Sequence, residues 1–254
     1  MELRGAVAVV TGASAGFGEL TSKRLAKEGA AVVLAARRAD RLEALAAEID
    51  GQGGRALAVR CDVTEVADLQ GLHDRVDETF GRCDVLINNA GIPGGGRFED
   101  LSLEQIERVI RVNLLGVLLC TRVFLPMMLD RGVGHIVNVG SLAGRYAGPG
   151  ASVYLASKHG VVAFSESLNF TTVPRNVLVT AVNPGFSRTE GFTGRGPWVV
   201  RVSPARVART IVRVVEKGIA PEVSIPQWAG WGWIIPPSIR RSLVSRWAPR
   251  DAVS

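Results

Sequence analysis

Cysteine is scarce in this sequence, with three residues among 254: Cys61, Cys83 and Cys120. They form no Cys-x-x-Cys pair and have no spacing typical of metal ligands, which argues against a redox motif and a cysteine-based metal site. We therefore expect three buried thiols, as in proteins of a reducing cytoplasm.

Histidine is equally scarce, with His73, His135 and His159 as its only occurrences. His159 follows Lys158 directly, but on a helix it would point about 100° away from that side chain. Because no pair of histidines has the spacing of metal ligands, no metal site is predicted.

Long apolar and long basic segments are also missing. No apolar run approaches the ~20 residues of a membrane span, and the first residues lack the long apolar region and cleavage site of a signal peptide. The net charge of +6 would suit an anionic cofactor, nucleic acid or an acidic membrane. The first 200 residues contain no basic run with interleaved aromatics, so no nucleic-acid partner is predicted.

The residues that are present predict one α/β domain. The hydrophobic content of 47% is enough for one sizeable core. Apolar runs expected as strands alternate with stretches of helical length, which predicts a doubly wound, Rossmann-like parallel sheet of about seven strands flanked by helices. The expected strands are 6–10, 31–36, 55–60, 84–87, 135–139, 177–182 and 222–225, and the expected helices include 19–28, 65–80, 103–128, 153–173 and 204–217.

A glycine-rich turn separates the first expected strand from the first helix, with the sequence Thr11-Gly12-Ala13-Ser14-Ala15-Gly16-Phe17-Gly18. Glycines let a backbone approach a pyrophosphate closely, and a helix N-terminus offers free N–H groups and partial positive charge. The flanking strand and helix favour a phosphate-binding turn. The alternative is a tight turn that binds no ligand.

Two arginines, Arg37 and Arg38, end the second expected strand, where NAD-binding proteins place an acidic residue on the ribose diol. An arginine there can pair with the 2′-phosphate of NADP. The nearby Asp40 begins Asp40-Arg41-Leu42-Glu43, which we interpret as a helix capping box. We therefore predict NADP(H) in preference to NAD(H), with selectivity resting mainly on Arg37 and assisted by Arg38.

A possible acid/base group lies in the second half of the chain. Tyr154 and Lys158 are four residues apart on an expected helix and so share one face, and Ser141 ends the preceding strand. A tyrosine has a pKa of about 10, and a nearby ammonium would lower it toward useful proton exchange. The alternative is an exposed Tyr/Lys pair on an ordinary helix. Asn113, near the middle of a long expected helix, is either structural or a functional residue that bends it.

Together these residues resemble the short-chain dehydrogenase/reductase family. The resemblance runs from Val7 to about Lys217. Its motifs are Thr11-Gly12-x-x-x-Gly16-x-Gly18, Asp62, Asn88-Asn89-Ala90-Gly91, Asn113, Ser141, Tyr154-x-x-x-Lys158 and Asn183-Pro184-Gly185.

The resemblance implies an enzyme that moves a hydride between NAD(P) and a small carbonyl or alcohol substrate. It implies Tyr154 as acid/base, Ser141 as holder of the substrate oxygen, Lys158 on the nicotinamide ribose and Asn113 on a relay water. The implied cofactor-binding set is Gly12, Ser14, Gly16, Phe17, Gly18, Arg37, Arg38, Asp62, Val63, Asn89, Ala90, Gly91, Tyr154, Lys158, Pro184, Gly185 and Thr189. An epimerase or dehydratase with tightly held cofactor, and a cofactor-sensing protein, are the alternatives.

The chain departs from the family pattern at its C-terminus. Residues 1–225 are expected to form the dinucleotide-binding and catalytic domain, and 226–254 an extension rich in tryptophan, arginine and proline. That extension would fold on the domain or at a subunit contact, and the alternative is a peripheral membrane contact that would suit an apolar, lipid-like substrate. We predict a cytoplasmic homo-oligomer, dimer or tetramer, with the usual tetramer in doubt. The family's substrate lid would lie between Phe186 and Ser203.

Overall fold

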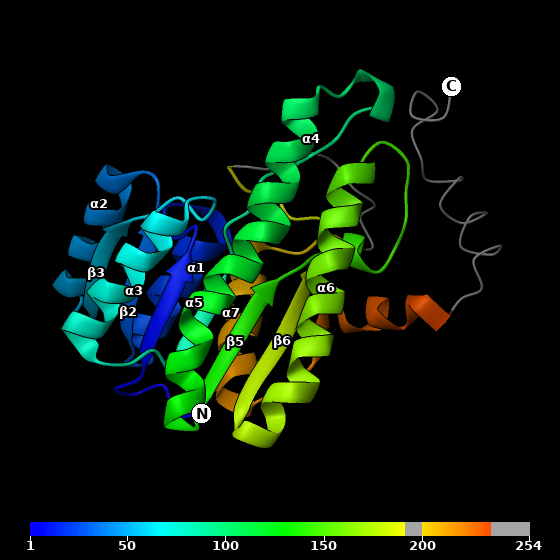
Figure 1. The fold of residues 1–254 in the computed structure, drawn as a ribbon. Coiled ribbons are helices and arrows are strands. Elements are labelled where there is room, and N and C mark those ends of the chain that lie inside the picture. The colour runs from blue at the N-terminus through cyan, green and yellow to red at the C-terminus, as the bar shows by residue number, and fades with distance from the viewer. Residues whose placement is uncertain (191–199, 235–254) are drawn as a thin grey trace.

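A computed structural model describes residues 1–190 and 200–234 of the chain. Its centre is one seven-stranded sheet with the strand order β3-β2-β1-β4-β5-β6-β7 (Figure 1). Every neighbouring pair is parallel. The doubly wound sheet predicted from the alternation of strands and helices is therefore confirmed.

The strands are short and, in the middle of the sheet, buried along their whole length, as expected where helices cover both faces. They are β1 Val7–Thr11, β2 Ala31–Ala36, β3 Arg55–Arg60, β4 Val85–Asn88, β5 Gly134–Val139, β6 Val177–Pro184 and β7 Glu222–Ile225.

Two helical layers cover the sheet, one on each face. On one side, β1 contributes Ala8 and Val10 to a core shared with helices α1, α2 and α7. On the other side, β1 contributes Val7 and Val9 to a core shared with α3 and α5. The helices are α1 Gly16–Lys27, α2 Ala39–Gly51, α3 Val66–Phe80, α4 Leu103–Ile110, α5 Gly116–Arg131, α6 Ser152–Thr172 and α7 Pro204–Lys217.

The long helix expected over 103–128 is interrupted. A π-helical turn, Arg111–Leu115, separates α4 from α5 and contains the fully buried Asn113. The whole region Leu103–Arg131 is long and apolar enough for a membrane span, so the expectation that nothing approaches that length was too simple. Cys120, Phe124 and Met128 are nevertheless fully buried in the core beside α3. This is the pattern of a core helix.

The expected capping box at Asp40 is wrong. Helix α2 begins at Ala39 with Arg38 as its N-cap residue, which makes no side-chain cap, and Asp40 lies inside the first turn. The helix starts earlier than the motif suggested, so the Asp40 side chain cannot reach back to cap it. An acidic side chain in the first turn still favours the positive end of the helix dipole.

The described part of the C-terminal extension packs on the domain. The 3₁₀ segment Gln227–Ile234 follows β7, Ala229 is buried, and the Tyr146 hydroxyl donates a hydrogen bond to the Ala229 carbonyl. Trp228 remains exposed. The membrane alternative also depends on the arginines at positions 240, 241, 246 and 250, which lie outside the described residues.

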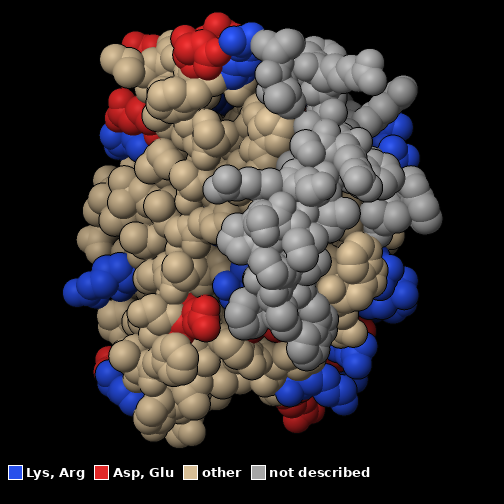
Figure 2. All heavy atoms as spheres, turned by 90° about the vertical axis from the view of Figure 1, so that its right-hand side faces the viewer, with Lys and Arg blue, Asp and Glu red and all other residues tan. Residues whose placement is uncertain are grey.

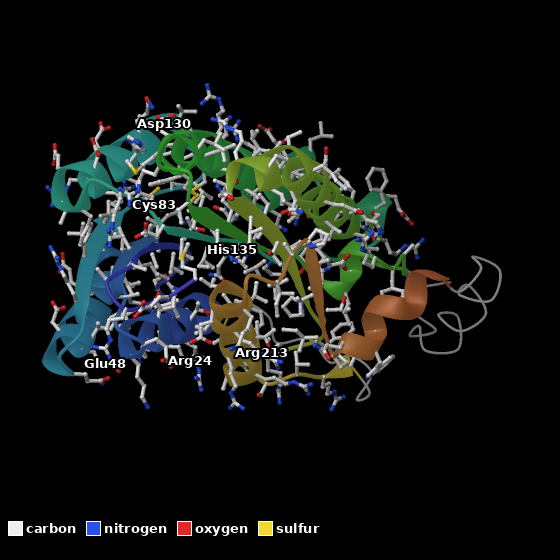
Figure 3. The ribbon with its side chains drawn as sticks, turned by 90° about the horizontal axis from the view of Figure 1, so that it is seen from below. Arg24, Glu48, Cys83, Asp130, His135 and Arg213 are labelled. Carbon is white, nitrogen blue, oxygen red and sulfur yellow. The ribbon has the colours of Figure 1, made fainter. Side chains whose placement is uncertain are left out.

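A buried histidine predicts a pH-dependent stability. His135 lies inside the molecule (Figure 3), 1% exposed, with Nε2 at 2.8 Å from Thr180 Oγ1. Burial lowers its pKa from 6.5 to about 4, and the N-terminal charge adds to the effect. Because the folded pKa lies below the unfolded one, the unfolded chain binds more protons between these values. The contribution of His135 is therefore complete above pH 6.5 and is lost as the pH falls toward 4.

We expect this group to lower the free energy of unfolding by about 3 kcal/mol across that pH range. Urea unfolding of the wild type and His135→Gln at several pH values measures the effect. The variant should lose less stability than the wild type on acidification. Parallel pH profiles would contradict the assignment.

Candidate active site

The predicted site residues gather at one edge of the sheet. The glycine-rich turn follows β1, Arg37 and Arg38 follow β2, and Asp62 and Val63 follow β3. Asn89, Ala90 and Gly91 follow β4, Ser141 follows β5, and Gly185 and Thr189 follow Pro184, the last residue of β6. Because all strands are parallel, these segments meet at the carboxyl edge, and the strand order reverses between β1 and β4. Open α/β sheets bind ligands at such a point.

The glycine-rich turn is closely packed against the end of β4. Gly12 has φ of +65°, and a Cβ there would lie 2.8 Å from Ala90 Cα. A Cβ on Gly18 would lie 2.3 Å from the Gly12 carbonyl oxygen. The Asn89 amide donates hydrogen bonds to the carbonyls of Thr11 and Gly12, at 2.9 and 3.2 Å. The Asn89 side chain therefore fixes the turn, which leaves its backbone to face a ligand.

The N-terminus of α1 lies in this turn without a side-chain cap. Its N-cap residue is Ala15, which has no side-chain hydrogen-bonding group. The first N–H groups of a 12-residue helix are thus available to an anion, together with the positive end of its dipole. Phe17 packs against the core below the turn. Thr189, from the segment after β6, lies beside Gly16, 3.4 Å from where a Cβ would stand. This cradle fits a dinucleotide pyrophosphate.

The two arginines after β2 point to different partners. Arg38 donates from Nε and Nη2 to Ser14 Oγ in the glycine-rich turn, at 3.1 and 3.0 Å. Its Nη1 also lies 2.6 Å from Glu190 Oε1. Arg37 instead extends toward Asp62, with Nη1 at 3.8 Å from Oδ2. Arg38, rather than Arg37, therefore faces the phosphate-binding turn.

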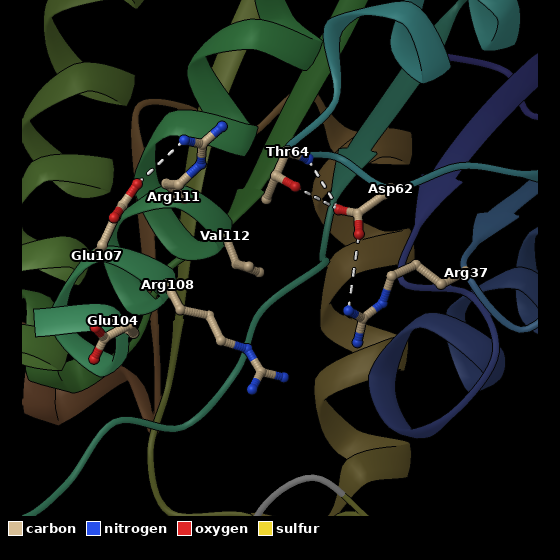
Figure 4. A pocket seen from close by; sticks show the side chains of 8 residues that line it. All are labelled: Arg37, Asp62, Thr64, Glu104, Glu107, Arg108, Arg111 and Val112. Atoms are coloured by element: carbon tan, nitrogen blue, oxygen red, sulfur yellow. Dashed lines mark hydrogen bonds and ion pairs between the residues drawn. The ribbon is translucent and has the colours of Figure 1, made fainter. Parts of the chain in front are cut away.

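Arg37 and Asp62 line a pocket at the end of β3 (Figure 4). Asp62 Oδ1 accepts hydrogen bonds from the backbone and hydroxyl of Thr64, at 3.0 and 2.9 Å, which fixes the carboxylate. Arg108 of α4 extends into the space opposite Arg37. Val63, the next residue after Asp62, is buried against Gly116, so the end of the π turn and the segment after β3 are packed together.

Ser141, Tyr154 and Lys158 converge as the sequence predicts. Ser141 forms a hydrogen bond with Tyr154, and its Oγ accepts one from the Ala143 N–H at 3.1 Å. Lys158 Nζ lies 5.9 Å from the centre of the Tyr154 ring and donates to the Val139 carbonyl at 2.8 Å. Val139 is the last residue of β5, so α6 and the end of β5 hold these groups together.

The pKa of Tyr154 differs from the sequence-based expectation, in which the Lys158 ammonium would lower it. Burial raises the pKa of Tyr154, and the hydrogen bond to Ser141 opposes that shift. Burial also lowers the pKa of Lys158 to about 8. The Lys158 ammonium therefore has the Val139 carbonyl as a partner, and the raised pKa of Tyr154 keeps its side chain a neutral phenol.

Asn113 brings a fourth element to the site. Its Oδ1 accepts from the Ile92 N–H at 2.8 Å, and its Nδ2 donates to the Ile92 carbonyl at 2.9 Å. A Cβ on Gly91 would lie 3.3 Å from Asn113 Oδ1 and 3.7 Å from Lys158 Nζ. The π turn therefore places Asn113 beside the end of β4 and near Lys158.

A charged cluster supports the loop after Ser141. Arg145 Nε lies 3.1 and 3.0 Å from the two carboxylate oxygens of Glu222, the first residue of β7. Asn183 of β6 donates to Glu222 at 2.6 Å, and Glu166 of α6 lies 3.5 Å from Arg145. We call these four residues the Arg145 clamp. The clamp joins the Ser141 loop to β6, β7 and α6.

Comparison with known proteins places this geometry in a family. The family model described as short chain dehydrogenase matches residues 6–199, more than half of the chain. The chain belongs to the short-chain dehydrogenase family. It is an oxidoreductase of that family, which acts on ketones and alcohols.

Among curated short-chain dehydrogenases, the chain is 36% identical over 219 residues to the ketoacyl reductase HetN of Nostoc sp., covering 84% of this chain and 76% of HetN. It is 40% identical over 185 residues to a 3-oxoacyl-[acyl-carrier-protein] reductase of Synechocystis sp., covering 72% and 75% of the two chains.

Solved short-chain dehydrogenases share this architecture over most of the chain. A variant of actinorhodin polyketide ketoreductase, solved with NADPH, superposes with a TM-score of 0.80 at 33% identity, covering 87% of this chain and 94% of that one. The 3-ketoacyl-(acyl-carrier-protein) reductase of Brucella melitensis, solved with NADH, gives 0.79 at 32% identity, covering 87% and 98%. The neighbours therefore include proteins solved with either coenzyme.

Four charged residues of this short-chain dehydrogenase were missed by sequence reasoning: Arg41, Glu190, Arg145 and Glu222. Arg41 lies three residues after Arg38 on the first turn of α2, so helical spacing could have suggested it. Glu190 follows Thr189 directly, but no motif connects it with Arg38, 152 positions earlier. The pairing of Arg145 and Glu222 likewise depends on strand order. Among the described residues, no cluster of His, Cys, Asp or Glu could hold a metal ion.

Proposed function

We propose that this protein is an NADP(H)-dependent oxidoreductase that interconverts a ketone and a secondary alcohol. The observation that carries the proposal is the convergence of Ser141, Tyr154, Lys158 and Asn113 beside the uncapped N-terminus of α1. A binding protein without chemistry would have no need to hold a partly buried tyrosine beside a buried lysine at the carboxyl edge of its sheet.

The cradle around α1 suits the coenzyme. The N–H groups of Gly16, Phe17 and Gly18 would hold the pyrophosphate, and Asp62 and Val63 would lie at the adenine end. When bound, the nicotinamide would exchange a hydride with the substrate carbon. Thr189, Pro184 and Gly185 would border the nicotinamide end of the site.

The side chains would handle the proton. Tyr154 would donate a proton to the carbonyl oxygen during reduction and take it back during oxidation. Ser141, already bonded to Tyr154, would hold the same oxygen. Lys158 would exchange its Val139 carbonyl partner for a ribose hydroxyl and favour the phenolate as the proton leaves. Asn113 would anchor a water molecule that relays protons to Lys158. Its hydrogen bond to the Ile92 carbonyl would hold the Asn113 side chain in place for this role.

The substrate class we favour is an apolar ketone such as a ketoacyl chain. Ketoacyl and 3-oxoacyl reductases are named among the relatives. Phe186, which is 40% exposed, follows the end of β6 at the carboxyl edge of the sheet, where the site lies. An apolar side chain beside the site would suit the carbon chain more than a small polar ketone.

The proposal is tested by following NADPH consumption across ketones of graded chain length and polarity. We expect turnover that rises with the length of a ketoacyl thioester. Product formation without net NADPH oxidation would favour an epimerase or dehydratase. Tight NADPH binding without any turnover across the series would favour a cofactor-sensing protein.

We also propose a homo-oligomer. The side of the molecule that carries α6 is poor in charged side chains (Figure 2). At the carboxyl end of α6, Phe170 and Val173 are 73% and 42% exposed. Burial of these residues against a second copy would remove apolar surface from water. Light scattering of the purified protein should give a mass at least twice the chain mass of 27.0 kDa.

A further inference from the structure

Glu190 bridges two arginines next to the glycine-rich turn. Its Oε1 lies 2.6 Å from Arg38 Nη1, and its Oε2 lies 2.5 Å from Arg41 Nη1. Resting on the proposed NADP(H) function, we infer that the Glu190 carboxylate takes the place of the ribose 2′-phosphate before NADP(H) binds. Glu190 is then a specificity-determining residue that weakens the preference for NADP(H).

The donors around Glu190 are those that a phosphate would use. Arg38 already donates two hydrogen bonds to Ser14 in the turn, which orients its guanidinium across the phosphate-binding region. Arg41 contributes a second guanidinium from the first turn of α2. A carboxylate and a phosphate offer similar planar or near-planar pairs of oxygens to an arginine fork. Two guanidiniums on one anion make the same kind of site for either.

The chain segment before Glu190 places it correctly for this role. Thr189 lies against Gly16 in the turn, so residues 189 and 190 cross over the N-terminus of α1 from the end of β6. The N-terminal end of α2 and the segment after β6 thus meet at one carboxylate. The side chains of Arg38, Arg41 and Glu190 are 41%, 45% and 52% exposed, so a coenzyme phosphate can reach them from solvent.

Electrostatic repulsion would keep the Glu190 carboxylate and the 2′-phosphate from binding the two arginines at the same time. Arg38 and Arg41 supply two positive charges, whereas Glu190 and a 2′-phosphate together would supply up to three negative charges. NADP(H) must therefore break both ion pairs of Glu190 when it binds. NAD(H), which has hydroxyls at this position, can leave the pairs intact. Removal of the Glu190 charge should help NADP(H) and leave NAD(H) unaffected.

The test uses the full-length protein and two fragments that differ only in the 2′-phosphate. Isothermal titration with adenosine 2′,5′-bisphosphate and with adenosine 5′-monophosphate compares the wild type and Glu190→Gln. We expect the variant to bind the bisphosphate about three- to tenfold more tightly, as for loss of two solvent-exposed ion pairs. Binding of the monophosphate should not change. The difference should shrink at high salt.

Glu78→Gln is the matched control. Glu78 lies on α3, is 66% exposed and pairs with Arg75 at 3.5 Å. Its replacement by glutamine therefore removes the same charge as Glu190→Gln, at a similar exposure. We expect no effect of this control on either fragment. An unchanged or weaker affinity of Glu190→Gln for the bisphosphate would overturn the inference, since it would make Glu190 neutral or helpful to the phosphate site.

Arg38→Ala separates the inference from the proposed function. If this variant selectively weakens binding of the bisphosphate while Glu190→Gln changes nothing, only the role of Glu190 is overturned. If Arg38→Ala leaves the affinity ratio of the two fragments unchanged, the phosphate does not bind at this arginine. In that case the inference and the proposed NADP(H) preference both fail.

Discussion

Replacement of Tyr154 by phenylalanine is expected to lower kcat by well over ~10²-fold, while the fold and the affinity for coenzyme stay nearly unchanged. The phenol is partly buried at the carboxyl edge of the sheet and bonded to Ser141. Phenylalanine keeps the ring and its packing but removes the hydroxyl that we propose gives a proton to the substrate oxygen. Steady-state kinetics and coenzyme titration measure the two effects separately.

The chain provides a matched control, because it contains two tyrosines. Tyr146 lies on the same loop-and-helix unit, but its hydroxyl donates to the Ala229 carbonyl. Tyr146→Phe should therefore keep most of the wild-type kcat. A Tyr154→Phe enzyme with a tenth of the wild-type rate or more would show that another group transfers the proton.

The second large effect concerns the coenzyme. We expect the wild type to prefer NADPH over NADH by about ten- to a hundredfold in kcat/KM, the effect of a charge-assisted hydrogen bond. Sequence position assigned this selectivity mainly to Arg37, but the structure places Arg38 on Ser14 and Arg37 on Asp62. Arg38→Asp should therefore reverse the preference, mostly through KM.

Arg37→Asp is the informative companion variant. Its side chain borders the pocket of Figure 4 rather than the glycine-rich turn, so its effect on the coenzyme ratio should be smaller than that of Arg38→Asp. If Arg37→Asp changed the NADPH/NADH ratio of kcat/KM more than Arg38→Asp did, coenzyme selectivity would rest mainly on Arg37, as its sequence position suggests. A wild type that prefers NADH would contradict the proposed coenzyme altogether.

Local sequence patterns were sufficient for the fold. The apolar runs expected as strands, such as 6–10, and the turns that follow them predict a parallel sheet without knowledge of any contact. The carboxyl ends of parallel strands share one edge, so this prediction also brings Gly12, Asn89 and Ser141 together. The four-residue spacing of Tyr154 and Lys158 correctly puts them on one helical face beside Ser141.

Features that depend on long-range contacts could not be predicted. Asn113 raised the question of a bend, but the π turn forms because its amide pairs with the Ile92 backbone across the site. Asp40 matched a capping motif, yet the chain begins α2 earlier, with Arg38 turned to Ser14. The high pKa of Tyr154 follows from burial that only the packed site reveals. Each of these outcomes is decided by partners distant in sequence.

The Arg145 clamp has a consequence for how the enzyme is made. Ser141, Tyr154 and Lys158 are all synthesised before β7, but the loop that carries Ser141 is tied to Glu222, 77 residues after Arg145. A nascent chain that ends before β7 would therefore contain every proposed catalytic side chain without the support of that loop. Catalytic activity would therefore arise late in synthesis, when the last strand joins the sheet. Chains that end before this strand would be inactive.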